Sequence, residues 1–154
     1  MLLKNKNIKN DIYNWYLNFE FYRPLFFTGV LDNETGFSHS KFIYEIITNN
    51  IHRFIRNIHS LSYKKSKCEI QRIVIIEKGK TRYHTHMIIE TPIHLNVWKF
   101  IDVLSTSWRN TRHGVSSQTD KIYDYENLAN YLSKEVYLNS VTGINWENCH
   151  RTIS

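Results

Sequence analysis

Apolar residues at helical spacing mark three segments of this chain. In residues 39–60 they recur every three or four positions as one stripe, which is typical of an amphipathic helix. A weaker stripe runs through residues 8–19 and a clearer one through residues 95–109. We predict a fourth helix over residues 125–137, because Asp124 precedes this stretch as an N-cap residue.

Four other segments have the composition or the alternation of β-strands. Residues 25–31 form a short apolar run that predicts a buried strand. Residues 70–77 are rich in β-branched side chains, and only a short basic turn separates them from a second apolar run at residues 83–91. Residues 114–123 are more polar, which indicates an edge strand.

The order of these elements favours an α+β fold. The loop between residues 70–77 and 83–91 is too short for the crossover that parallel strands require, so this pair forms an antiparallel hairpin. We therefore predict a central antiparallel β-sheet of about five strands flanked by helices. The 154 residues form a single domain, spanning 1–154, and the tail from residue 139 has no clear pattern.

The composition indicates what kind of partner and which cellular compartment to expect. The net charge of +6 favours a polyanionic partner, either nucleic acid or an anionic membrane. Neither Cys68 nor Cys149 belongs to a Cys-x-x-Cys pair, which argues against a structural zinc site or a disulfide framework. The chain has no apolar run of transmembrane length and no secretory signal, so we expect a cytoplasmic protein without a membrane partner.

Two histidines at the start of the strand at residues 83–91 indicate a metal site. His84 and His86 are alternate residues, so both imidazoles face the same side of the strand. If the preceding turn is centred between Lys80 and Thr81, Glu77 lies directly opposite His84 and shares that face. The pattern predicts that these three side chains converge at the mouth of the hairpin. A register slip of one residue would separate them.

Two imidazoles and one carboxylate leave open positions on a metal, which is the pattern of a catalytic site. An oxygen ligand together with solvent or phosphate suits Mg²⁺ or Mn²⁺ as cofactor. In the alternative interpretation, the histidines lie on a solvated face and Glu77 forms a salt bridge with Lys78 or Lys80. The sequence leaves both interpretations open.

The helix predicted at residues 125–137 presents a candidate nucleophile. Tyr131 lies opposite the apolar arc of this helix, and Lys134 follows one turn later on the same side. A neighbouring cation favours the phenolate, which suits nucleophilic attack. The alternative is a surface tyrosine that packs on the lysine stem. Tyr137 lies about 120° further around the helix, poorly placed as a second nucleophile.

Taken together, these residues resemble the HUH endonuclease superfamily of rolling-circle replication initiators, relaxases and single-strand transposases. PLFFTGVL is similar to the first motif of the family, and IVIIEKGKTRYHTHMIIE resembles its metal motif, a carboxylate followed on the next strand by His-hydrophobe-His. NLANYLSKEV is similar to the nucleophile helix of replication initiators. The resemblance covers residues 24–137, and Thr85 stands where the family usually has a bulky hydrophobe.

The resemblance implies a single-tyrosine nickase-ligase. Glu77, His84 and His86 would hold the metal at a scissile phosphate of single-stranded DNA. Tyr131 would attack this phosphate and form a 5′-phosphotyrosine, with Lys134 positioning the phosphate or stabilising charge in the transition state.

The basic residues beside the metal, Lys78, Lys80 and Arg82, would hold the DNA backbone. The expected function is initiation of rolling-circle replication of a viral or plasmid replicon at a single-stranded origin, which can include a hairpin. The chain has no P-loop pattern, so a separate helicase and polymerase are expected partners, and a homodimer is one assembly that fits. The alternatives are a single-strand transposase or mobilisation relaxase of the same superfamily, and a non-catalytic basic module that binds nucleic acid without metal.

Overall fold

The computed structural model describes residues 2–32, 42–63, 69–138 and 142–152, without the side chains of residues 2–7, 134–138 and 142. At its centre is a five-stranded sheet in the order β4-β1-β3-β2-β5, with every neighbouring pair antiparallel. The strands are β1 (Pro24–Leu31), β2 (Arg72–Lys78), β3 (Tyr83–Glu90), β4 (Gly114–Lys121) and β5 (Thr142–Ile144). The predicted α+β fold with a central antiparallel sheet is confirmed.

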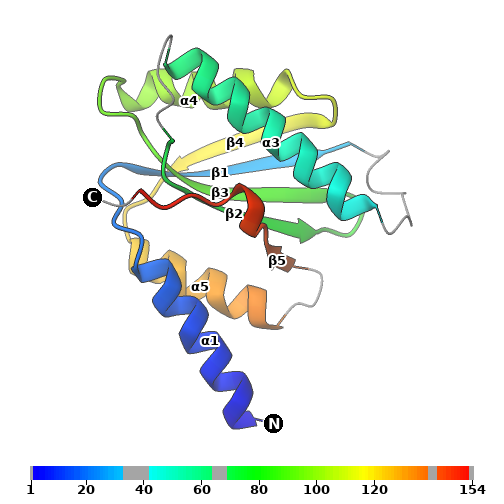
Figure 1. Ribbon diagram of the computed structural model, residues 1–154, viewed down its shortest axis with the longest axis vertical. Coiled ribbons are helices and arrows are strands. Elements are labelled where there is room, and N and C mark those ends of the chain that lie inside the picture. The colour runs from blue at the N-terminus through cyan, green and yellow to red at the C-terminus, as the bar shows by residue number, and fades with distance from the viewer. Residues whose placement is uncertain (1, 33–41, 64–68, 139–141, 153–154) are drawn as a thin grey trace.

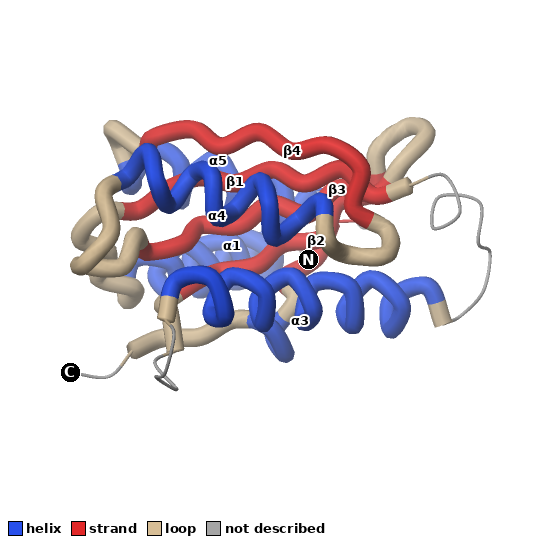
Figure 2. Tube along the Cα trace, turned by 90° about the horizontal axis from the view of Figure 1, so that it is seen from above, coloured by secondary structure: helices blue, strands red, loops and turns tan. Residues whose placement is uncertain are grey.

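Helices cover both faces of this sheet (Figures 1 and 2). On one face lie α3 (Ile43–Ser62) and α4 (Val97–Arg109), and on the other lie α1 (Leu2–Leu17) and α5 (Tyr125–Leu138). None of the helices that the structure describes has both the length and the apolar content needed to cross a membrane.

The sheet and the helices on its two faces enclose two apolar clusters, one on each side of the sheet. Val74 and Met87 pack under α3 and α4, whereas Ile73, Ile75 and Ile88 pack against α1 and α5. Because alternate residues of a strand face opposite sides, a central strand covered on both faces needs apolar residues at nearly every position. This requirement explains the continuous apolar runs of β2 and β3.

Side-chain caps fix the starts of two helices. The Asn96 side chain accepts a hydrogen bond of 2.8 Å from the backbone N–H of Lys99 at the start of α4. At the start of α5, Asp124 accepts one of 3.1 Å from the backbone N–H of Asn127, which confirms the predicted N-cap.

The N-terminal helix is longer than the sequence predicted. It begins at Leu2 rather than at residue 8. Residues 4–11 are mostly lysine and asparagine, so no apolar stripe marks the first turns of α1 and the periodicity shows only its later part.

The C-terminal tail contains ordered elements that the sequence did not predict. β5 pairs with the end of β2, and a 3₁₀ turn, η1 (Trp146–Asn148), follows it. His150 then forms an isolated bridge with Arg72. A three-residue strand is too short to show an alternating pattern, and the open edge of β2 determines where it pairs.

Gly29 is the position in β1 where a side chain does not fit. A Cβ atom there would lie 2.6 Å from the Trp108 ring, which is fully buried and donates a hydrogen bond of 3.3 Å to the carbonyl of Val30. Trp108 is therefore a core residue, and its ring cannot stack on a base.

A Gly29→Ala substitution is expected to lower the free energy of unfolding by about 1–3 kcal/mol, because the buried ring must shift. Denaturant titration would measure the loss. Gly143→Ala is the matched control, since a Cβ at Gly143 meets no atom within 4 Å. Equal stability of the two variants would contradict this account of Gly29.

Candidate metal centre

The β2–β3 hairpin brings the three predicted metal ligands together. Glu77 lies directly opposite His84 in the register of the two strands, and His86 is the next residue of β3 on that face. The ligand atoms that these residues offer all lie within 4.8 Å of one another. They are the one such group of three among the described residues. The predicted convergence is confirmed, and the group could hold a metal ion.

Glu77 is directed toward the histidines rather than toward the lysines of the turn. Its Oε2 atom lies 3.0 Å from Nε2 of His86. Within the described residues Glu77 forms no ion pair with Lys78 or Lys80, the alternative that the sequence left open. The Oε2 atom of Glu77 and the Nε2 atom of His86 are both atoms that can bind a divalent metal ion.

Two residues of β1 hold the His86 ring in place. The Thr28 hydroxyl lies 3.1 Å from Nδ1 of His86, so Nε2 is the nitrogen left for Glu77 or a metal. The Phe26 ring stacks on the imidazole, with ring centroids 5.5 Å apart and planes 8° apart. The sequence did not predict either contact, because both depend on the pairing of β1 with β3.

Burial lowers the pKa of His86 below the ordinary value for histidine, and the hydrogen bond with Glu77 opposes this shift without cancelling it. The ring is therefore neutral near pH 7, which is the form that binds metals. A neutral ring has one N–H. Donation from Nε2 to Glu77 requires Nδ1 to accept from Thr28, whereas metal binding at Nε2 requires Nδ1 to donate. The Thr28 hydroxyl can satisfy both tautomers.

A tight turn closes the hairpin beside the site. The backbone N–H of Gly79 donates a hydrogen bond of 2.9 Å to the carbonyl of Arg82. A Cβ at Gly79 would lie 2.7 Å from that carbonyl oxygen and 3.4 Å from the His84 ring, so the turn favours glycine. Lys78, the last residue of β2, and Lys80 on the turn are exposed, and Arg82 is half-buried.

Thr85 faces away from the site. Its side chain is fully buried on the opposite side of β3, and its hydroxyl donates a hydrogen bond of 3.1 Å to the carbonyl of Ile75. The polar side chain between the two histidines is thus satisfied within the core and takes no part in the metal group.

The metal group lies on the same face of the sheet as α5. Glu77 continues the alternation of Ile73 and Ile75 on β2, and this face packs against Ala129 and Leu132 of α5. α5 crosses this face toward the end that carries the hairpin turn (Figure 1). β5, which follows α5, pairs with Glu77.

Tyr131 points away from the packed side of α5, as the sequence predicted, and 59% of it is exposed. Among the described residues it forms no hydrogen bond with Glu77, His84 or His86. Lys134 belongs to the same helix, but its side chain, like that of Tyr137, lies outside the described part of the chain.

No protein-family model, no curated protein and no solved structure matches this chain. The resemblance to HUH endonucleases therefore depends on the residues of the chain alone.

A Thr28→Val substitution is expected to weaken Mn²⁺ binding about 10- to 100-fold, because it removes the hydroxyl that orients His86 and keeps the shape of the side chain. Isothermal titration calorimetry would measure the affinity. Thr28→Ser, which retains the hydroxyl, should bind nearly as well as the original protein. If Thr28→Val binds Mn²⁺ with unchanged affinity, Thr28 does not position the ligand.

Proposed function

We propose that this protein is a metal-dependent nuclease that nicks and rejoins single-stranded DNA through a covalent bond to Tyr131. The observation that carries the proposal is the convergence of Glu77, His84 and His86 on the sheet face covered by the helix of Tyr131. The helix that carries Tyr131 packs on this face through Ala129 and Leu132, so α5 and the metal group lie on the same side of the sheet.

The donor set supports a catalytic divalent ion. Two imidazoles and one carboxylate leave coordination positions for solvent and phosphate, and we propose Mg²⁺ or Mn²⁺ as the cofactor. Such an ion, when bound, supplies Lewis acidity that stabilises the charge on a scissile phosphate. Glu77 and Thr28 hold His86 from its two nitrogens, so the ligand is oriented before any ion binds.

Tyr131 supplies the nucleophile in this proposal. Its Oη atom attacks the phosphorus and loses its proton, and the bond from phosphorus to the 3′ oxygen breaks. The leaving oxygen takes up a proton and becomes a free 3′-hydroxyl, while the 5′ phosphate remains on Tyr131. Attack by a 3′-hydroxyl on this phosphotyrosine reverses the steps, rejoins the strand and releases the tyrosine. Lys134 would balance charge on the phosphate.

Basic residues beside the metal group would hold the strand. Lys78 is exposed at the end of β2 and Lys80 on the hairpin turn, which the backbone carbonyl of Arg82 closes. Together with the net charge of +6, they favour a phosphate backbone as the ligand at this end of the sheet.

Among the possible roles of such a nuclease, we propose initiation of rolling-circle replication. A lysine three residues after the tyrosine resembles replication initiators, and the same chemistry would serve a transposase or a relaxase. In this role we propose a helicase and a polymerase as partners, and the 154 residues of the sequence contain no P-loop pattern.

Incubation with a labelled single-stranded oligonucleotide and Mn²⁺, followed by a denaturing gel, tests the proposal. The expected result is a protein–DNA adduct that EDTA prevents and that protease treatment converts to free DNA carrying a short peptide. A non-catalytic module would bind the oligonucleotide equally well with or without Mn²⁺ and form no adduct, and a pool of sequences guards against a wrong choice of origin.

A further inference from the structure

Four large apolar side chains have most of their surface exposed to solvent. They are between 68% and 92% exposed, the highest values among the large apolar side chains that the structure describes. These four, called the aromatic end below, are Tyr22, Ile93, Trp98 and Tyr123. Single exposed apolar residues need no explanation, but a group of them at one place marks a binding surface.

The strand register brings these four residues to one end of the sheet. Pro24 pairs with Glu90, so Tyr22 before β1 and Ile93 after β3 emerge side by side. Lys121, the last residue of β4, pairs with Leu25 and also places its ammonium group 4.4 Å from the centre of the Trp98 ring. Tyr123 follows two residues later.

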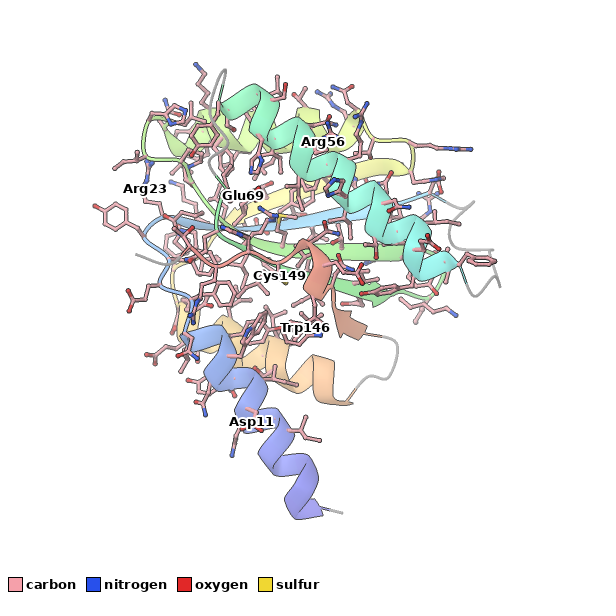
Figure 3. The ribbon with its side chains drawn as sticks, in the orientation of Figure 1. Asp11, Arg23, Arg56, Glu69, Trp146 and Cys149 are labelled. Carbon is pink, nitrogen blue, oxygen red and sulfur yellow. The ribbon has the colours of Figure 1, made fainter. Side chains whose placement is uncertain are left out.

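A pocket opens at the aromatic end. Its volume is about 700 Å³, and Tyr22 and Ile93 contribute to its wall. This volume lies within the range that holds a ligand the size of a nucleotide. Arg23 and Arg151 also line it, and Figure 3 shows Arg23 at this end of the molecule.

Three of the acidic groups at this end are engaged within the protein, whereas the carboxylate of Glu20, which also lines the pocket, has no hydrogen bond or ion pair among the described residues. Glu90 accepts hydrogen bonds of 2.9 and 2.7 Å from the backbone N–H groups of Tyr22 and Arg23. Asp124 caps α5, and Glu69, which lines the pocket, lies 3.3 Å from the Arg72 guanidinium. These contacts offset the negative charges of Glu90, Asp124 and Glu69 before any ligand binds.

The cations are less committed. Among the described residues, Arg23, Lys121 and Arg151 form no ion pair. Arg23 gives one N–H to the carbonyl of Pro92 and keeps its other donors, while Lys121 lies over the Trp98 ring. Cations without an ion pair, interleaved with exposed aromatic rings, favour an anionic ligand that carries flat, stackable groups. They do not favour the apolar surface of another protein as the ligand.

We propose that the aromatic end binds single-stranded nucleic acid, with bases stacking on Trp98, Tyr123 and Tyr22 and one nucleotide entering the pocket beside Arg23. This contact is separate from the metal centre. His84 and Glu90 are six residues apart on β3, a span of about 20 Å. This inference rests on the proposed function in one respect, namely that the bound strand is the strand that is nicked.

Fluorescence anisotropy with EDTA present measures strand binding without any metal-dependent chemistry. For an oligonucleotide of about 16 nucleotides, Trp98→Leu and Tyr123→Leu should each weaken binding about 10-fold, because they remove a stacking surface. Trp98→Phe keeps an aromatic ring and should restore most of the affinity. Lys121→Gln should lower the slope of log affinity against log salt by about one.

Trp146→Leu is the matched control, because Trp146 is also exposed but lies at η1 against Trp15, with ring centroids 4.7 Å apart (Figure 3). It should bind the oligonucleotide as the original protein does. The proposal is overturned if Trp98→Leu and Tyr123→Leu both bind with unchanged affinity, the result expected if the aromatic end instead docks a protein.

The two proposals fail separately. Strand binding that depends on Trp98 without any phosphotyrosine adduct would reject the proposed reaction and support this surface. Adduct formation together with unchanged binding by the leucine variants would reject this surface and support the reaction.

Discussion

A Tyr131→Phe variant is expected to form no covalent adduct with single-stranded DNA, while it still binds Mn²⁺ and the oligonucleotide. The substitution removes the one atom that the proposed reaction uses as a nucleophile and leaves the ring in place. Because Tyr131 is exposed and forms no hydrogen bond among the described residues, the loss of its hydroxyl should leave thermal stability unchanged within about 0.5 kcal/mol. The adduct band on a denaturing gel should fall below detection.

Tyr13→Phe is the matched control for this prediction, since it removes the hydroxyl of a half-buried tyrosine on α1 that belongs neither to the metal group nor to the aromatic end. It should form the adduct at the original rate. A Tyr131→Phe protein that still forms the adduct would assign the nucleophile to another residue, and peptide mapping of the adduct by mass spectrometry would identify it.

The sequence predicted the metal group because the geometry that forms it is local. A short turn joins β2 to β3, so the position of Glu77 opposite His84 followed from counting residues outward from that turn. The strands themselves were visible in the apolar runs on either side. No long-range information was needed to bring the three ligands together.

The residues that orient His86 could not be predicted in the same way. Thr28 and Phe26 reach the imidazole only because β1 lies beside β3, and the chain between these strands includes α3 and β2. Apolar periodicity identifies a strand and its buried face, but not which strand becomes its neighbour. The surroundings of a ligand are therefore harder to read from sequence than the ligand itself.

The aromatic end was missed for a related reason. Trp98 fitted the apolar stripe predicted for residues 95–109, yet it lies at the first turn of α4 and remains exposed beside Lys121. Helical spacing alone cannot separate a core residue such as Trp108 from an exposed one on the same helix. Only the packed structure shows that the rings gather where β1, β3 and β4 have their ends.

A Glu77→Gln variant is expected to lose at least about 100-fold in Mn²⁺ affinity and to form no adduct at Mn²⁺ concentrations that saturate the original protein. The amide has nearly the same shape and can still accept or donate a hydrogen bond to His86, so the hairpin should keep its structure. It lacks the negative charge that makes a carboxylate oxygen a good ligand for a hard divalent ion. Disturbing a contact that supports a ligand lowers metal affinity about 10- to 100-fold, and the loss of a direct ligand should lower it further. Isothermal titration calorimetry gives the affinity.

The control for this variant is Glu45→Gln, which makes the same change of charge at an exposed position of α3, on the other side of the sheet. It should bind Mn²⁺ and form the adduct as the original protein does, which separates the role of Glu77 as a ligand from a general effect of net charge. Full affinity and full adduct formation by Glu77→Gln would exclude the carboxylate from the site. The histidine pair would then need a third ligand from another part of the chain or from the DNA phosphate.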